Sequence, residues 1–168
     1  MANEKFHLLG VISDTHGAAG TLSNIMLMLE YKKVEGIIFL GDGHRDTEPY
    51  EAAFPRFYRV KGNCDWSCDY PGEELIRPFG VPVFITHGHR YYVKDDTGLL
   101  TMEALSRGAK AALFGHTHIP YLSYDGGMCI MNPGSAAAED TDCCGSTKKG
   151  SLKGNCAEKA ASFNAPQM

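Results

Sequence analysis

Five short segments of this sequence carry residues that bind metal ions, and each follows directly after an apolar run. In chain order the segments are Asp14-Thr15-His16, Gly41-Asp42, Gly62-Asn63-Cys64-Asp65, His87-Gly88-His89 and Gly115-His116-Thr117-His118. The candidate ligands within them are Asp14, His16, Asp42, Asn63, His87, His116 and His118. This mixture of oxygen and imidazole nitrogen suits Mn²⁺, Fe²⁺, Zn²⁺ or Ni²⁺ better than Mg²⁺ or Ca²⁺, which prefer shells made only of oxygen.

The number of candidate ligands favours a centre with two ions. Seven ligands are too many for one catalytic ion that keeps an open position, and they are enough for two ions if one carboxylate bridges them. Two ions held about 3.5–4 Å apart activate a bridging hydroxide and hold a phosphoryl oxygen during in-line displacement. One Asp-x-His or His-x-His alone would be weak evidence, but five such segments in order argue strongly against coincidence. The residues therefore predict metal-assisted hydrolysis of a phosphate ester.

Several other polar residues near these segments have a simpler explanation. We expect His44 and His89 to support the site or to lie in exposed loops rather than to bind metal, and we expect His7 at the surface. Cys64 is expected to be a small packed residue beside the site, although a reactive thiol is the alternative. Trp66 either contacts a substrate or packs the loop in which it lies.

The candidate ligands follow strands of a predicted α/β domain. Buried strands are expected at 7–13, 36–40, 57–61, 81–86 and 111–114, and a hairpin at 121–124 and 128–132. Leu22, Ile25, Met26 and Leu29 have the spacing of a helix, and a weaker helical pattern covers about 97–107. Because neighbouring parallel strands bring their carboxyl ends together, the five segments should converge on one edge.

Size and charge narrow the class of protein. The chain has 168 residues, enough for one domain with a real core, and a net charge of −4 from 16 Lys and Arg against 20 Asp and Glu. This balance makes a stable nucleic-acid partner unexpected.

No apolar run is long enough for a membrane span or a signal peptide, so we expect a cytoplasmic protein that is not attached to membranes. The six cysteines are then expected to be thiols.

The five segments, with Ile119-Pro120 and Asn132-Pro133-Gly134-Ser135, resemble the calcineurin-like metallophosphoesterases, and in particular the small YfcE-type phosphodiesterases. The resemblance covers residues 6 to about 135 and implies a four-layer α/β/β/α sandwich with a dinuclear site on one edge. It implies one ion bound by Asp14, His16, Asp42 and His118. It implies a second ion bound by Asp42, Asn63, His87 and His116, with Asp42 bridging.

The resemblance also implies an activity and a cofactor. The enzyme would hydrolyse small phosphodiesters with two divalent ions, Mn²⁺ being expected and Ni²⁺, Fe²⁺ or Zn²⁺ the alternatives, and with Asp42, Asn63 and His87 as catalytic residues. Larger members of the family have a histidine where Cys64 stands, so a substrate with a good leaving group, or protonation by water, is favoured here. The fold is also similar to that of the retromer subunit Vps29, so a non-catalytic protein-binding scaffold is the alternative. The complete ligand set favours the enzyme.

The sequence departs from the family after residue 135. Family members continue there into strands that complete the second sheet, whereas residues 136–168 of this chain are polar and have no strand or helix period. We therefore expect a metallophosphoesterase domain at 1–135, a loosely ordered tail at 136–168, and a second sheet that is incomplete at its C-terminal end. An exposed sheet edge of this kind predicts a homo-oligomer or reduced stability.

Overall fold

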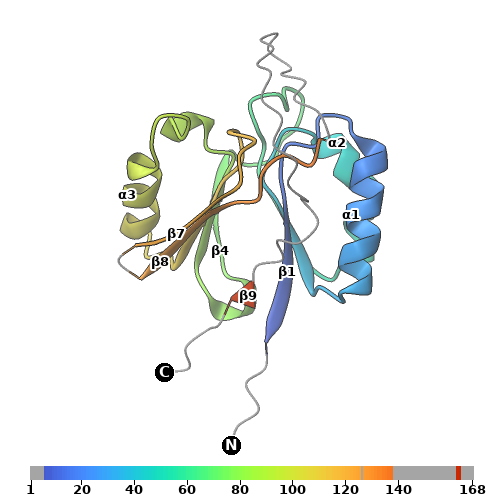
Figure 1. The fold of residues 1–168 in the computed structure, drawn as a ribbon, viewed down its shortest axis with the longest axis horizontal. Helices are drawn as coiled ribbons and strands as arrows, with labels where there is room; N and C mark the ends of the chain where they lie inside the picture. The colour runs from blue at the N-terminus through green and yellow to red at the C-terminus, as the bar shows by residue number, and fades with distance from the viewer. Residues whose placement is uncertain (1–5, 126, 138–161, 164–168) are drawn as a thin grey trace, which may run out of the picture.

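Two β-sheets packed face to face, each covered on its outer side by a helix, make up the fold (Figure 1). The computed structural model describes residues 6–125, 127–137 and 162–163. The layers run helix, sheet, sheet, helix, so the expected four-layer α/β/β/α architecture is confirmed. The expected tail lies outside the described residues, apart from 136–137 and 162–163.

The first sheet has the strand order β3-β2-β1-β9. Its strands are β1 (His7–Ile12), β2 (Gly36–Phe39), β3 (Phe57–Arg59) and β9 (Ser162–Phe163). The first three run parallel and lie where the apolar runs predicted them. β9 pairs antiparallel with β1, an addition that the sequence did not predict because two residues are too few to show a pattern.

The second sheet has the strand order β4-β5-β6-β8-β7. Its strands are β4 (Glu73–Ile76), β5 (Val83–Thr86), β6 (Ala111–Leu113), β7 (Tyr121–Asp125) and β8 (Met128–Asn132). β5, β6 and β8 run parallel, while β4 and β7 are antiparallel strands at the two edges. The predicted hairpin is confirmed as β7 and β8, and β4 is the strand that the prediction missed.

Helices cover the outer faces and shape the loops. The helices are α1 (Ala19–Tyr31), α2 (His44–Thr47) and α3 (Gly98–Ser106), and the 3₁₀ turns are η1 (Glu48–Ala53), η2 (Pro78–Gly80) and η3 (His89–Tyr91). Leu22, Met26 and Leu29 of α1 are buried, at the spacing that predicted this helix. None of the helices in the described part of the chain has the length and apolar character needed to cross a membrane.

The central strands are buried on both faces, which explains their continuous apolar sequences. Ile38 of β2 packs between the sheets, whereas Ile37 and Phe39 pack against α1. Ile85 of β5 likewise packs between the sheets, and Phe84 packs against α3. Each fully buried side chain of this kind stabilises the fold by about 1.5–3 kcal/mol. The strands are therefore firm supports for the loops at their ends.

The carboxyl ends of the parallel strands of both sheets meet at one end of the sandwich. The His116 backbone N–H, just after β6, donates to Asp14 Oδ2, just after β1, at 3.1 Å. The Gly115 N–H donates to the His87 carbonyl, which follows β5, at 3.1 Å. The expected convergence is therefore confirmed, with the segments supplied by two sheets rather than by one.

Candidate metal centre

Five of the seven expected ligands have a left-handed backbone conformation, with φ of 55° at Asp14, 42° at His16, 60° at Asp42, 67° at His116 and 59° at His118. Only three other non-glycine residues in the described part of the chain have positive φ. This conformation costs an L-residue about 1–2 kcal/mol. Backbone strain of this kind concentrates at functional sites, where the surrounding structure holds it in place. The strain therefore singles out this end of the sandwich.

The Asp14 carboxylate is held by one oxygen and left open at the other. Its Oδ2 accepts hydrogen bonds from the Ser13 hydroxyl at 2.5 Å and from the His116 N–H. Its Oδ1 is buried without a hydrogen-bond partner and faces His118 Nε2 at 3.2 Å and His16 Nε2 at 3.8 Å. Burial opposes the charge on Asp14, but contact with His118 and other positive neighbours outweighs it and holds the pKa of this carboxyl below its ordinary value.

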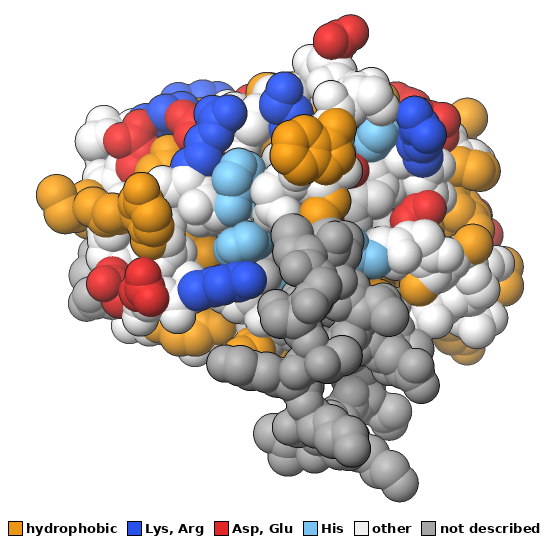
Figure 2. Space-filling view, turned by 90° about the horizontal axis from the view of Figure 1, so that it is seen from above, with side chains coloured by type: hydrophobic (Ala, Val, Ile, Leu, Met, Phe, Trp, Pro, Cys, Tyr) orange, Lys and Arg blue, Asp and Glu red, His pale blue; other side chains and the backbone are white. Residues whose placement is uncertain are grey.

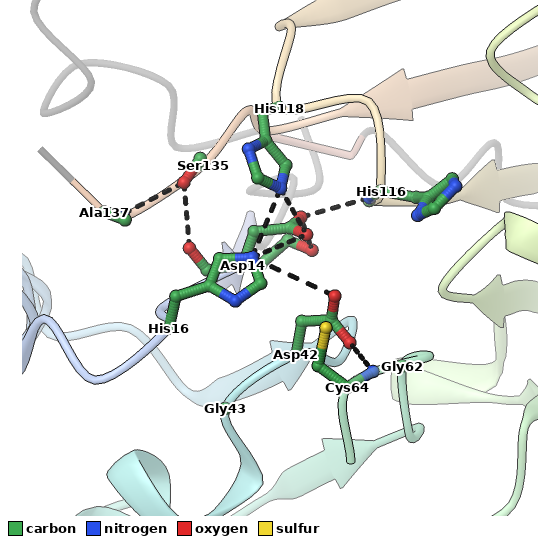
Figure 3. A network of polar contacts seen from close by, with 12 residues as sticks. Asp14, His16, Asp42, Gly43, Gly62, Cys64, His116, His118, Ser135 and Ala137 are labelled. Carbon is green, nitrogen blue, oxygen red and sulfur yellow. Dashed lines mark hydrogen bonds and ion pairs between the residues drawn. The ribbon is translucent and has the colours of Figure 1, made fainter. Parts of the chain in front are cut away.

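Asp14, His16 and His118 form the first group of possible ligands, whose ligand atoms all lie within 4.8 Å of one another. The Nε2 atoms of the two histidines are 3.2 Å apart, and Figure 3 shows both rings directed at the Asp14 carboxylate. His16 Nε2 also lies 3.9 Å from Asp42 Oδ2. Two imidazole nitrogens and a carboxylate oxygen in this arrangement suit a divalent transition metal.

Asp14, Asp42 and His87 form a second group within the same limit. His87 Nδ1 pairs with the Leu40 carbonyl at 2.7 Å, so Nδ1 carries the proton and the lone pair of Nε2 is directed into the site. This Nε2 is buried without a hydrogen-bond partner, 3.3 Å from Asp42 Oδ2 and 3.9 Å from Asp14 Oδ1. Burial lowers the pKa of His87, but the two carboxylates outweigh burial and raise it overall.

Asp42 lies between the two groups. Its Oδ1 accepts the Cys64 N–H at 2.7 Å, and its Oδ2 faces His16 (Figure 3). The same Oδ2 also faces His87. One carboxylate oxygen is thus fixed by the backbone, while the other is shared between the histidines of the two groups. This is the position that a bridging carboxylate would need.

Asp65 supports the loops that carry the expected ligands, a role that was not predicted from the sequence. Its carboxylate accepts backbone N–H groups of Asp42 at 2.8 Å, Gly43 at 2.9 Å, His44 at 3.1 Å and Gly62 at 2.9 Å. Burial opposes its charge, but these hydrogen bonds, led by Gly62, lower its pKa to about 2. Asp65 therefore ties the loop after β2 to the loop after β3. An Asp in a glycine-containing turn commonly accepts backbone N–H groups. The turn sequence before Asp65 could therefore have indicated this role.

Two of the histidines that were not expected to bind metal lie outside the centre. His44 is buried and its Nδ1 lies 3.1 Å from Asp65 Oδ1, which agrees with a supporting role. His7 lies at the far end of β1, where its Nδ1 is 2.8 Å from Glu35 Oε1 and its ring stacks on Phe79. Neither ring belongs to a group of possible metal ligands within the described residues.

His116 lies beside the two groups rather than inside them. Its ring points away from Asp14 in Figure 3 and lies 5.1 Å from the His87 ring and 6.1 Å from the His89 ring, between centroids. Burial, with the nearby His87 and Lys94, lowers the pKa of His116 to about 4. The imidazole is therefore neutral at pH 7, the state that binds a metal ion.

Asn63 and Cys64 follow each other beside Asp42. Asn63 Oδ1 is buried without a hydrogen-bond partner, while its amide nitrogen donates to Cys64 Sγ at 3.3 Å. The Cys64 sulfur is in a disulfide, so the expectation of thiols is wrong for this residue. Its sulfur lies within 4.8 Å of the ligand atoms of His16 and Asp42, but a disulfide sulfur is not the thiolate that binds metals. Cys68 and Cys129 are free thiols, as expected.

Three buried atoms at the candidate centre lack hydrogen-bond partners, as the ligands of a divalent cation would. Asp14 Oδ1, Asn63 Oδ1 and His87 Nε2 are all buried and have no hydrogen-bond partner. A buried polar atom without a partner costs about 1–3 kcal/mol, and two of these atoms, Asp14 Oδ1 and His87 Nε2, lie 3.9 Å apart, where one bound cation could partner both. Since all three atoms can donate a lone pair to a metal ion, the residues fit the expected group.

A cavity of about 370 Å³ opens beside the centre. His16 and Asp42 line it together with parts of the loops 43–46 and 64–67. Its size suits a small ligand. Figure 2 looks onto this end of the sandwich and shows histidine side chains with both Lys or Arg and Asp or Glu side chains around them.

Comparisons with known proteins agree with the geometry. Residues 8–147 match the family described as "Calcineurin-like phosphoesterase superfamily domain". The probable metallophosphoesterase YsnB of Bacillus subtilis is 33% identical over 125 residues, covering 74% of this chain and 72% of YsnB. The phosphodiesterase YfcE of Escherichia coli is 26% identical over 152 residues, covering 74% of this chain and 77% of YfcE.

The fold is shared with a protein of another kind. The crystal structure of a Vps29 single mutant from Entamoeba histolytica superposes with a TM-score of 0.69 at 23% identity, covering 79% of this chain and 76% of Vps29. At that identity the likeness concerns the fold alone. The family match, by contrast, spans most of the sequence and includes every candidate ligand. The chain therefore belongs to the calcineurin-like phosphoesterase superfamily.

Proposed function

We propose that this chain is a phosphodiesterase that hydrolyses small phosphodiesters at a centre of two divalent metal ions. The observation that carries this proposal is the set of buried lone-pair atoms without partners, Asp14 Oδ1, Asn63 Oδ1 and His87 Nε2, at one end of the sandwich. Membership of a phosphoesterase superfamily and similarity to the phosphodiesterase YfcE support the class of reaction.

The proposed ligand assignment is built on the two groups. One ion would be held by Asp14, His16, Asp42 and His118, and the other by Asp42, Asn63, His87 and His116. When bound, two such ions supply a hydroxide nucleophile near neutral pH and hold the phosphoryl oxygens of the substrate. Mn²⁺ is the preferred ion, with Ni²⁺, Fe²⁺ and Zn²⁺ as alternatives. His116 needs a turn of its ring away from His89 to join this set.

The residues of the chain contribute position and charge to the reaction. The Cys64 N–H fixes one oxygen of Asp42, and the Leu40 carbonyl fixes the tautomer of His87. Asn63 presents a buried, neutral oxygen without a hydrogen-bond partner, which we assign to the second ion. No side chain stands at position 64 that can protonate a departing oxygen, so substrates whose leaving group needs no acid should react fastest.

Metal removal and reconstitution test the proposal. The protein is dialysed against a chelator, reloaded with Mn²⁺, Ni²⁺, Fe²⁺, Zn²⁺ or Mg²⁺, and assayed for metal content and for hydrolysis of bis(p-nitrophenyl) phosphate. We expect about two ions per chain, no turnover without metal and the highest turnover with Mn²⁺. The His7→Gln variant, changed at the far end of β1, is the matched control. Full turnover in excess chelator, or no turnover with both ions bound, would contradict the proposal.

A protein-binding scaffold like Vps29 is the second candidate. The shared fold supports it, and so do the exposed side chains of Ile119, Leu122 and Tyr124 on and beside the edge strand β7. A scaffold has no need for a complete ligand set, so the metal measurements above separate the two candidates. A chain that binds no metal and hydrolyses no phosphodiester would fit the scaffold.

A further inference from the structure

The cavity beside the metal centre has two walls of different chemistry. The loop after β2 contributes residues 43–46, and the loop after β3 contributes residues 64–67. His16 and Asp42 connect this cavity to the metal centre, so a phosphodiester bound there would extend one of its ester groups between the two loops. The residues of the cavity determine how that ester group is recognised, an inference that rests on the proposed function.

Trp66 lies on the second wall with its side chain open to solvent. It is 92% exposed, more than any other large hydrophobic side chain in the described part of the chain. The indole takes part in none of the stacking or cation–π contacts found among the described residues. The ring therefore does not pack the loop, which was one of the two explanations that the sequence allowed. Both faces of the ring are available to a ligand.

The backbone on either side of Trp66 is held in place. Asp65, directly before it, is fixed by its hydrogen bonds to the loop after β2, including one from the Asp42 N–H. Ser67, directly after it, accepts a hydrogen bond from Arg45 Nη2 at 3.0 Å, which joins the two walls of the cavity. A ring carried on a fixed backbone loses little freedom when a ligand stacks on it.

Among the polar side chains along the cavity, one guanidinium is the group that can attract a phosphate ester. Its two carboxylates outside the metal centre are occupied: Asp46 Oδ2 accepts from the Thr15 hydroxyl at 2.6 Å and from the Gly17 N–H at 2.9 Å, and Asp65 accepts backbone N–H groups. Arg45 supplies a guanidinium on the same cavity. An anionic ligand with a planar ring would therefore meet a cation and an aromatic surface together.

We propose that Trp66 is a specificity-determining residue, which selects phosphodiesters that carry a planar aromatic or heteroaromatic ester group of the nucleoside type. An offset stack between the indole and such a ring buries the exposed aromatic surface. Stacking of a base on an aromatic side chain is worth about a 5- to 160-fold gain in affinity. Esters that carry only a small alkyl group or a sugar would not receive this gain.

The single tryptophan of the chain makes a direct binding test possible. Protein loaded with Zn²⁺ is titrated with adenosine 5′-monophosphate, ribose 5-phosphate and inorganic phosphate, with indole fluorescence excited at 295 nm, where adenine does not absorb. We expect adenosine 5′-monophosphate to change the emission and to bind at least about 5-fold more tightly than ribose 5-phosphate. Equal affinities for these two ligands would overturn the proposal.

Variants of Trp66 test whether a preference for adenosine 5′-monophosphate depends on the indole ring. By calorimetry, Trp66→Ala should reduce the affinity for adenosine 5′-monophosphate to that for ribose 5-phosphate, and Trp66→Phe should keep most of the preference. With bis(p-nitrophenyl) phosphate, Trp66→Ala should raise KM at least about 5-fold and leave kcat unchanged. Tyr31→Ala, which removes an 87% exposed ring on α1, is the matched control and should change neither. A preference that survives in Trp66→Ala would also overturn the proposal.

The experiments can contradict the proposed function and the inference about Trp66 independently of each other. If every metal-loaded form lacks turnover while the adenine preference and its loss in Trp66→Ala are observed, the proposed function is wrong and the ligand site at Trp66 stands. If turnover with Mn²⁺ is normal and the preference is absent, the proposed function stands and the inference about Trp66 is wrong.

Discussion

Two carboxylates define the candidate centre because each is held by one oxygen and open at the other. Ser13 and the His116 N–H hold Asp14 through Oδ2, and the Cys64 N–H holds Asp42 through Oδ1. The remaining oxygens face imidazole nitrogens. Polar groups fixed in this way keep their geometry when a ligand arrives, which is what a metal centre needs.

Asp42→Asn should weaken both proposed metal positions together. The amide keeps the shape of the side chain but removes the charge that faces His16 of the first group and His87 of the second. We expect fewer ions per chain and a loss of several orders of magnitude in the hydrolysis of bis(p-nitrophenyl) phosphate, measured with Mn²⁺ in excess. Asp95→Asn, at an exposed position, is the control. Near wild-type turnover of Asp42→Asn would contradict the two-ion assignment.

Asp65→Asn should reduce stability without removing a metal ligand. The folded pKa of Asp65 is about 2 against an ordinary 3.8, so its contribution is complete above about pH 4 and is lost as the pH falls through about 2. That shift corresponds to about 2 kcal/mol at pH 7. Urea unfolding of the metal-free protein should therefore show Asp65→Asn less stable by about this amount at pH 7 and less sensitive to pH between 4 and 2.

Asp69→Asn is the control for this prediction, because Asp69 is an exposed carboxylate in the same loop. It should leave both the stability at pH 7 and its dependence on pH unchanged. If Asp65→Asn unfolds with the wild-type pH dependence, the hydrogen bonds to Asp65 do not favour its charged form as described.

At the scale of the elements, the loops come close enough that only glycine fits at certain positions. Gly115, after β6, lies against the turn after β1, and a Cβ there would be 1.9 Å from Ser13 Oγ and 2.7 Å from Asp14 Oδ2. Gly62, after β3, has a similar relation to Asp42, since its Cβ would be 2.0 Å from Asp42 Oδ1. The glycines beside the ligands therefore allow close approach of neighbouring loops.

Gly115→Ala should displace the Asp14 carboxylate and lower metal affinity. The added methyl group cannot fit unless Ser13 or Asp14 moves. We expect a lower Mn²⁺ affinity by calorimetry and a lower melting temperature. Gly20→Ala is the control, because its Cβ would meet nothing within 4 Å and alanine favours the helix α1. Unchanged Mn²⁺ affinity in Gly115→Ala would show that the contact does not position Asp14.

The sequence predicted the elements that are buried and missed those that are short or exposed. Apolar runs located β1, β2, β5 and β6 because both faces of these strands are covered. β4 was missed because Glu73 and Glu74 interrupt its pattern on an edge strand. α2 has four residues, too few for a helical period, and β9 has only two.

The candidate site was predictable as a set of residue types but not as a geometry. The positions after the strands identified the seven expected ligands, and the structure groups Asp14, His16 and His118 and also Asp14, Asp42 and His87. The direction of the His116 ring depends on contacts with His87 and His89 from other segments, which no local pattern reveals. The role of Asp65 was missed for the same reason, because three of the four backbone N–H groups that it accepts lie in a different loop.

At the scale of the whole molecule, the second sheet ends in an edge strand with apolar side chains. Within the described residues β7 pairs only with β8, and Leu122 and Tyr124 are 62% and 74% exposed. An edge of this kind offers both backbone hydrogen bonds and apolar surface to another chain. On this ground self-association stays a prediction, which a variant of this edge can test.

Leu122→Lys should reduce self-association without changing the metal centre. The charge disfavours pairing along the edge of β7. We expect sedimentation velocity to show a concentration-dependent larger species for the wild type and only the monomer for Leu122→Lys, with equal turnover per chain. Leu27→Lys, at a similarly exposed position on α1, is the control. A wild type that stays monomeric up to high concentration would contradict this prediction.

The division of the candidate ligands between two sheets has a kinetic consequence. Asp14, His16 and Asp42 follow strands of the first sheet, whereas His87 and His118 follow strands of the second. Each proposed ion would therefore join the two halves of the sandwich, and it could leave only when one half gives up its ligands. The residence time of the ions would then depend on how firmly the two sheets pack against each other, so that exchange with an isotopic label would be faster wherever that packing is weakened.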